Sequence, residues 1–229
     1  MFINDKDFNF VEADEKKIAE LAKGKFVLAL DFDGVISAPY ELKAKYINEL
    51  GYSIKPEESG KEDCLRLGVS KEDYDVGSIR GYTEKPGILP LEEGFAENWK
   101  NIRNLPNTFI AIVTSRYDSM LSHLFEFLKY HSINVDAVMN TKYANKGAYL
   151  DILRPHVFVE DTLKKLIEAK SQCSKDYHCK FLLYRNIQNK NHNIEDKDVI
   201  DMSTWSKINS FILEEHKKHF DKVNLSKSI

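Results

Sequence analysis

The sequence predicts a doubly wound α/β protein with a parallel sheet and a small, mainly helical cap insertion. Strand-sized apolar runs alternate with helical patterns over most of the 229 residues, which implies parallel strands joined by helical crossovers. The first run, residues 26–30, is apolar throughout, as expected for a strand buried on both faces. A polar stretch rich in glycine interrupts the alternation, so we expect a core of residues 1–37 and 91–229 and a cap of residues 38–90.

The elements before the cap and within it come first along the chain. Residues 1–24 read as a helical lead-in, with Ile18 and Leu21 on its apolar face and Gly24 as its stop. A helix is expected over residues 40–50, closed by Gly51. Within the rest of the cap, only a short helical piece near residues 70–75 is expected.

The remaining elements complete the core. Strands are expected at residues 109–113, 135–139, 157–159, 180–184 and 199–200, and helices at residues 91–104, 119–130, 148–153, 162–171 and 205–219. Together with the first run, these segments predict about five or six parallel strands.

Composition limits the class of protein and its partners. A hydrophobic content of 42% with 30% charged residues is typical of a globular domain, and the net charge of −3 comes with interleaved signs. Nucleic acid is therefore not expected as the main partner, although a small basic pocket for a phosphorylated metabolite remains compatible. No apolar run approaches the roughly 20 residues of a membrane span. Three sparse cysteines and the lack of a signal-peptide pattern favour the cytoplasm, while the oligomeric state stays open.

Polar residues follow three of the expected strands. The first strand ends in Asp31-Phe32-Asp33-Gly34, a later one in Thr114-Ser115-Arg116, and the strand at 157–159 in Glu160-Asp161. Ligands of parallel α/β sheets bind beyond the carboxyl ends of the strands. The sequence therefore predicts one site where these carboxylates and hydroxyls meet.

These motifs resemble those of the haloacid dehalogenase-like (HAD) phosphohydrolase superfamily. The Asp-x-Asp-Gly-Val run at 31–35 is similar to its first motif and residues 112–116 to its second. Lys146 is similar to the lysine of the third, and residues 157–161 to the acidic fourth. A lone Asp-x-Asp is weak evidence, but four motifs in order, between about residues 26 and 165, are specific. The resemblance implies a HAD-like Rossmannoid core, with the insertion at the position of a type C1 cap.

The resemblance also implies an activity, namely Mg²⁺-dependent hydrolysis of a small phosphomonoester through an aspartyl-phosphate. Asp31 takes the role of nucleophile and Asp33 that of general acid and base, with Gly34 allowing the turn that Asp33 needs. Thr114 and Lys146 bind the phosphoryl group and stabilise its charge. Gly34, Ser115 and Arg116 are further candidates for phosphate binding, although Arg116 reads equally well as a surface residue.

The metal ligands implied by the resemblance are Asp31, the backbone carbonyl of Asp33, and Asp161, with Glu160 as a further metal-site residue. The fourth motif departs from the commoner pattern, because Glu160 replaces a glycine and Lys165 occupies a later acidic position.

Several alternatives remain. Lys142 competes with Lys146 for the third motif, and the same fold also carries phosphotransferases, mutases and non-catalytic regulatory domains that bind phosphorylated ligands. A dehalogenase is disfavoured, because that chemistry does not need Asp33. The cluster of Cys173, His178 and Cys179 lacks a fourth ligand for zinc. In the cap, four side chains could face a substrate: Tyr40, Tyr74, Arg80 and Tyr82.

Overall fold

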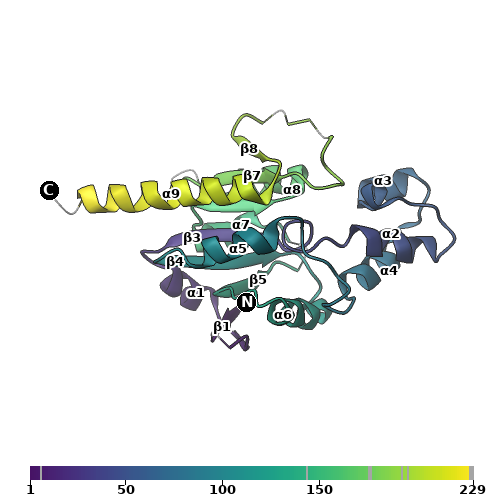
Figure 1. The fold of residues 1–229 in the computed structure, drawn as a ribbon, viewed down its shortest axis with the longest axis horizontal. Helices are drawn as coiled ribbons and strands as arrows, with labels where there is room; N and C mark the ends of the chain where they lie inside the picture. The colour runs from purple at the N-terminus through teal and green to yellow at the C-terminus, as the bar shows by residue number, and fades with distance from the viewer. Residues whose placement is uncertain (6, 143, 175–176, 192, 195, 227–229) are drawn as a thin grey trace.

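The fold is built on one eight-stranded sheet with the order β2-β1-β5-β4-β3-β6-β7-β8. The computed structural model describes residues 1–229 except 6, 143, 175–176, 192, 195 and 227–229 (Figure 1). The strands are β1 (Phe2–Asn4), β2 (Phe10–Glu12), β3 (Phe26–Leu30), β4 (Thr108–Thr114), β5 (Ala137–Asn140), β6 (Val157–Glu160), β7 (Lys180–Tyr184) and β8 (Val199–Met202).

The six strands from β5 to β8 in this order are parallel, which confirms the predicted sheet. The helices around them are α1 (Glu15–Ala22), α5 (Phe95–Arg103), α6 (Leu121–Tyr130) after the short helix η2 (Asp118–Met120), α7 (Gly147–Leu153), α8 (Leu163–Gln172) and α9 (Trp205–Ser226).

Helices cover both faces of the sheet, as the alternation in β3 shows. Phe26, Leu28 and Leu30 pack into the apolar cluster that includes residues of α5, α6 and α9. Val27 and Ala29 pack into a second cluster with residues of α1, α7 and α8. A strand buried on both faces must be apolar throughout, and this explains the continuous run that predicted it.

The N-terminal expectation was wrong in part. Residues 1–24 contain a hairpin before α1, because β1 and β2 pair antiparallel and β1 also pairs with β5. Each strand has only three residues, too few to show a period, and the stabilisation comes from tertiary contacts. One of these is the ring of Phe10, stacked on Phe125 with the centroids 4.3 Å apart. Sequence periodicity cannot report such contacts.

The cap segment is more helical than expected. It contains α2 (Tyr40–Asn48), η1 (Pro56–Glu58), α3 (Lys61–Arg66) and α4 (Lys71–Tyr82), which lie together at one end of the molecule, with α2 and α4 packed on each other (Figure 1). Two glycines of α4 permit the packing. A Cβ at Gly77 would lie 2.5 Å from Ile47 Cγ1, and one at Gly81 would lie 2.9 Å from Lys43 Cγ. Apolar side chains of α2, α3 and α4 form a small cluster of their own.

Two chain segments connect the cap to the sheet, and they run side by side. The N–H of Ala38 donates to the carbonyl of Pro90 at 2.9 Å, and that of Glu92 donates to Ile36 at 2.8 Å. The buried carboxylate of Glu92 accepts hydrogen bonds from Tyr40, the first residue of α2, and from Tyr184 at the end of β7. The connection is therefore tied to both the cap and the core.

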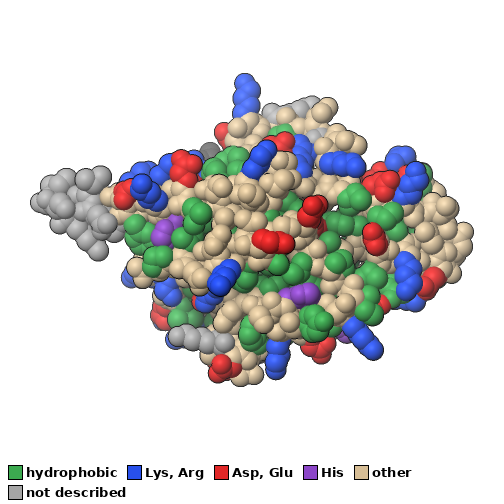
Figure 2. All heavy atoms as spheres, viewed as in Figure 1, with side chains coloured by type: hydrophobic (Ala, Val, Ile, Leu, Met, Phe, Trp, Pro, Cys, Tyr) green, Lys and Arg blue, Asp and Glu red, His purple; other side chains and the backbone are tan. Residues whose placement is uncertain are grey.

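The surface agrees with the interleaved charges of the sequence. On the face drawn in Figure 2, Lys and Arg side chains alternate with Asp and Glu. None of the described helices is both long enough and apolar enough to cross a membrane. The cytoplasmic location stays a prediction.

Candidate active site

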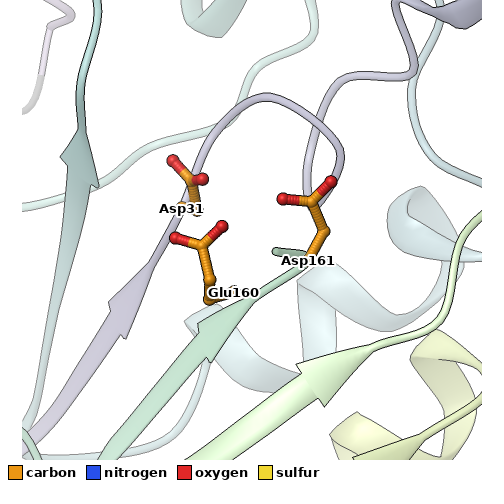
Figure 3. A group of neighbouring side chains, drawn as sticks. All are labelled: Asp31, Glu160 and Asp161. Carbon is orange, nitrogen blue, oxygen red and sulfur yellow. The ribbon is translucent and has the colours of Figure 1, made fainter. Parts of the chain in front are cut away.

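Three carboxylates converge at the carboxyl edge of the sheet. Asp31 follows β3, Glu160 is the last residue of β6, and Asp161 comes next. Because β3 and β6 are parallel neighbours, their ends place these side chains face to face (Figure 3). One carboxylate oxygen from each lies within 4.8 Å of the others. The structure thus brings together three of the residues predicted to form the metal site.

Lys146, which immediately precedes α7, reaches into this cluster. Its Nζ lies 2.7 Å from Asp31 Oδ1 and 2.7 Å from Glu160 Oε2, and all three side chains are buried. Lys142 is exposed and pairs with Asp118 at 2.8 Å. Of the two lysines that the sequence left open, Lys146 is the one beside the carboxylates.

The electrostatics of Asp31 follow from this crowding. Burial and the neighbouring charge of Glu160 raise the pKa of Asp31 to about 7, against the opposing effect of Lys146 and Lys165. The backbone N–H of Phe32 donates to Asp31 Oδ1 at 2.7 Å and orients the carboxylate. Three carboxylates this close repel one another, so a bound cation would stabilise them.

The Asp33 side chain is not part of that cluster, and the chain turns at the next residue, Gly34. Gly34 has a φ of 83°, and a Cβ there would lie 2.1 Å from Asp161 Oδ2, so only glycine fits. The Asp33 carboxylate accepts from Arg116 at 2.8 Å and 2.7 Å, and from Ser37 at 3.1 Å. Burial acts to raise the pKa of Asp33, but the Arg116 guanidinium holds it below its usual value. Asp33 is therefore an ionised carboxylate here.

Arg116 is buried, with 3% of its surface exposed, so the reading of a surface arginine was wrong. Its guanidinium lies over Phe32, with the carbon 4.7 Å from the ring centroid, and 5.5 Å from that of Tyr82. Nη1 has no hydrogen-bond partner among the described residues. Arg116 also lines the cavity described below, so this donor is available to a ligand.

The two hydroxyl residues of the second motif differ in their surroundings. Thr114 is the buried last residue of β4, and both it and Ser115 line the cavity. The Ser115 hydroxyl is already hydrogen-bonded to Thr141, with the two oxygens 3.0 Å apart. Thr114 is therefore the better placed of the two for a ligand.

Lys165 is a site residue that the sequence did not assign a role. Its side chain is reached by solvent, yet it lies in the cavity among the carboxylates. Desolvation acts to lower its pKa, but Glu160, Asp31, Asp161 and Asp33 together hold that pKa well above its usual value. Lys165 lies in the first turn of α8, two residues after Leu163, and no spacing rule in the sequence links it to Asp161.

Two asparagines that follow β7 also contact the site, and nothing in the sequence indicated them. Asn186 Nδ2 donates to Asp161 Oδ2 at 2.8 Å and to the Gly34 carbonyl at 3.1 Å. Asn189 Nδ2 donates to the Asp161 carbonyl at 2.5 Å. They fix Asp161 from a loop whose sequence carries no recognisable motif.

A cavity of about 1200 Å³ opens from this edge toward the cap. The cap side chains that line it include Tyr40, Tyr74 and Tyr82, three of the four that the sequence suggested. Arg80 instead pairs with Glu49 at 2.8 Å and packs on Tyr46. The cavity therefore lies between the carboxylate cluster and the cap helices.

The cluster fits a hard divalent cation. Carboxylate oxygens are the ligands that Mg²⁺ prefers, and Asp31, Glu160 and Asp161 supply them. The Asp33 carboxylate is paired with Arg116, and the role of its backbone carbonyl as a metal ligand stays a prediction. Cys173 and Cys179 of the suggested zinc cluster are free thiols.

The comparisons with known proteins define the fold class. No protein-family model and no curated protein matches the sequence. A conserved haloacid dehalogenase-like protein of unknown function from Agrobacterium tumefaciens is a structural match with a TM-score of 0.55. It is 15% identical and covers 83% of this chain and 99% of its own. The fold of the protein is therefore HAD-like.

Two further matches carry functional names. A putative phosphatase from Clostridium difficile has a TM-score of 0.53 and 14% identity, over 83% of this chain and 99% of its own. CbbY from Rhodobacter sphaeroides, in complex with xylulose-1,5-bisphosphate, has a TM-score of 0.53 and 14% identity, over 80% of this chain and 95% of its own. At these identities the similarity is one of fold.

Proposed function

We propose that this protein is a Mg²⁺-dependent phosphatase that hydrolyses a small phosphomonoester through an aspartyl-phosphate on Asp31. The observation that carries the proposal is the buried Asp31 carboxylate, 2.7 Å from Lys146 and grouped with Glu160 and Asp161 at one end of a cavity. The HAD-like fold supports phosphoryl transfer as the class of reaction, because its structural matches include hydrolases and a putative phosphatase.

In this proposal the carboxylate of Asp31 attacks phosphorus and the leaving alcohol departs. The N–H of Phe32 and the ammonium of Lys146 hold Asp31 in one orientation. Asp31, Glu160 and Asp161 would hold Mg²⁺, which when bound would supply positive charge between the anionic nucleophile and the anionic phosphate. Lys146 and the free Nη1 of Arg116 are the donors best placed for the phosphoryl oxygens.

Asp33 is the group that transfers protons in the two steps of this mechanism. As an ionised carboxylate it is suited to accept the proton of the water that hydrolyses the phosphoenzyme. To protonate the leaving group it must first carry a proton, and its pair with Arg116 opposes this. Arg116 releases that constraint when its guanidinium turns from Asp33 to the phosphoryl group of the substrate.

The test is phosphate release from a panel of phosphomonoesters by wild type, Asp31→Asn and Asp75→Asn, with Mg²⁺ or with EDTA. Asp75 also lines the cavity but belongs to the cap, so it controls for the same chemical change. We expect metal-dependent turnover in wild type and Asp75→Asn and none in Asp31→Asn. Turnover by Asp31→Asn would refute the nucleophile. Transfer to an added acceptor in place of release would identify a phosphotransferase, and an inert wild type a binding domain.

A further inference from the structure

The cap contains a buried lysine, Lys43, that pairs with no carboxylate in the part of the chain that the structure describes. Lys43 of α2 has 3% of its surface exposed and lines the cavity. Among the ion pairs of the described residues, none includes Lys43. Its neighbours are the rings of Tyr74 and Tyr82, each with its centroid 5.3 Å from Nζ, and the Tyr74 hydroxyl at 3.4 Å. An ammonium among phenol rings remains an uncompensated charge.

Such an arrangement is unusual, because buried lysines are normally paired. Aromatic faces attract a cation but carry no net negative charge. The charge of Lys43 must therefore be balanced from outside the protein or left at a cost to stability. The cavity that Lys43 lines is the route by which an anion can reach it.

A second polar group lies in the same wall. The hydroxyl of Ser78 on α4 is buried beside Tyr74 and makes no hydrogen bond of good geometry among the described residues, and Ser78 lines the cavity. It lies on the helix that packs on Lys43 through Gly81. An ammonium and a hydroxyl on adjoining helices are the donors that a phosphate or carboxylate requires.

The acidic side chains at this end of the cavity do not supply the missing partner. Asp63 pairs with Arg66 at 2.8 Å, and Asp75 pairs with Lys71 at 3.2 Å. Glu62, which also lines the cavity, is exposed to solvent.

The cap donors adjoin the catalytic edge. The ring centroid of Tyr82 lies 5.3 Å from Lys43 Nζ and 5.5 Å from the guanidinium carbon of Arg116. Arg116 in turn pairs directly with Asp33. One molecule in the cavity can therefore meet both groups. We propose that Lys43 and Ser78 form a second anion site, and that the preferred substrate is a phosphomonoester with another anionic group, carboxylate or phosphate, at its remote end. This inference rests on the proposed function.

The kinetic test uses alkyl phosphates of equal chain length that end in a methyl group, a carboxylate or a second phosphate. We expect wild type to favour the doubly anionic esters in kcat/KM. Lys43→Met should reduce that preference about 30-fold or more, mainly through KM, because a buried ionic contact is lost. Lys45→Met is the matched control, since Lys45 is exposed on the same helix. The relative rates of the carboxylate and phosphate esters identify which anion the site prefers. Equal use of all three esters, or a preference that survives in Lys43→Met, would overturn the inference.

A binding test separates this inference from the proposed function. Calorimetry with propane-1,3-bisphosphonate and propylphosphonate, which are not hydrolysed, needs no turnover. Tighter binding of the bisphosphonate by wild type, and not by Lys43→Met, would support the anion site even if no ester were hydrolysed. Turnover without that difference would refute the anion site and leave the phosphatase intact.

Folding of the variants is measured alongside. Replacement of an unpaired buried charge by an apolar side chain of similar size is expected to leave thermal stability unchanged or higher. If Lys43→Met fails to fold, Ser78→Ala removes the second donor and should weaken bisphosphonate binding about fivefold without affecting propylphosphonate. Equal weakening for both ligands would contradict the inference.

Discussion

The two ends of the cavity each bury a lysine, and the two lysines have opposite surroundings. Lys146 at the sheet edge lies 2.7 Å from both Asp31 and Glu160, whereas the contacts of the Lys43 ammonium with the described residues are with phenol rings and a hydroxyl. The first lysine satisfies protein carboxylates, and the second has its charge available for a ligand. Charge pairing thus distinguishes the lysine that is neutralised within the protein from the lysine that we propose binds an anionic group of the substrate.

The largest effect is expected at Asp31, where replacement should lower activity and raise stability. Asp31→Asn removes the nucleophile and should lower kcat by about 10⁴-fold or more. In EDTA at pH 8 the same change should raise the free energy of unfolding by about 2 kcal/mol, because it removes a buried, crowded charge. Urea unfolding and phosphate release measure the two quantities. Loss of stability in this variant would show that the carboxylate cluster is not under electrostatic strain.

The stability that Asp31→Asn gains over wild type should increase with pH. The folded pKa of Asp31, about 7, lies above its ordinary value of 3.8. The folded state therefore binds the proton more tightly, and the penalty of the ionised form grows as pH rises from about 4 to 7. The advantage of Asp31→Asn should accordingly vanish near pH 4.

The two lysines themselves provide the next test. Lys146→Met leaves Asp31 and Glu160 buried without their cation, so the unfolding free energy should fall by about 3 kcal/mol. Lys43→Met removes a charge that no carboxylate needs, so its unfolding free energy should match or exceed that of wild type. Both variants are measured by urea unfolding in EDTA at pH 8. An equal loss of unfolding free energy in the two variants would contradict the difference in charge pairing between the two lysines.

Arg116 joins the two ends, and its replacement should act on Asp33. Arg116→Met removes the guanidinium that holds the pKa of Asp33 below its usual value, so that pKa should rise. We expect kcat/KM to fall about 100-fold and its alkaline limb, which the protonated Asp33 would set, to move to higher pH. A pH profile displaced only downward, with no shift of the limb, would mean that Arg116 does not control the protonation of Asp33.

The smallest effect is expected at the connection between the cap and the core. Burial raises the pKa of Glu92 to about 7, above its ordinary value of 4.5. Stability should therefore decline as pH rises between about 4.5 and 7, by about 1 kcal/mol from this group. Glu92→Gln should flatten the curve in that range, as followed by thermal unfolding. An unchanged slope would exclude Glu92 as the titrating group.

The comparison also explains what the sequence could reveal. The catalytic edge follows from topology, because parallel strands deliver Asp31, Thr114 and Glu160 to one edge and each ends an apolar run. Lys146 was identified by the same route, although only the structure separated it from Lys142. About five or six parallel strands were predicted from the alternation of strand and helix patterns, and the structure has six among the described residues.

What the sequence could not reveal depends on tertiary contacts. The hairpin of β1 and β2 is stabilised by the edge of β5 and by Phe125. Asn186 fixes Asp161 from a loop far along the chain. Lys43 looks like any surface lysine of an amphipathic helix until Gly81 brings α4 over it. None of these contacts leaves a period or a motif in the sequence.

The most direct test of the central claim is mass spectrometry of the protein quenched in acid during turnover of a phosphomonoester, in the Asp33→Asn background with Mg²⁺. If Asp31 is the nucleophile and Asp33 activates the hydrolytic water, the phosphoenzyme accumulates, and the peptide with Asp31 gains the mass of one phosphoryl group. The modification should be absent after Asp31→Asn is added. A phosphoryl group on another residue, or turnover with no phosphoenzyme at any time, would contradict the mechanism.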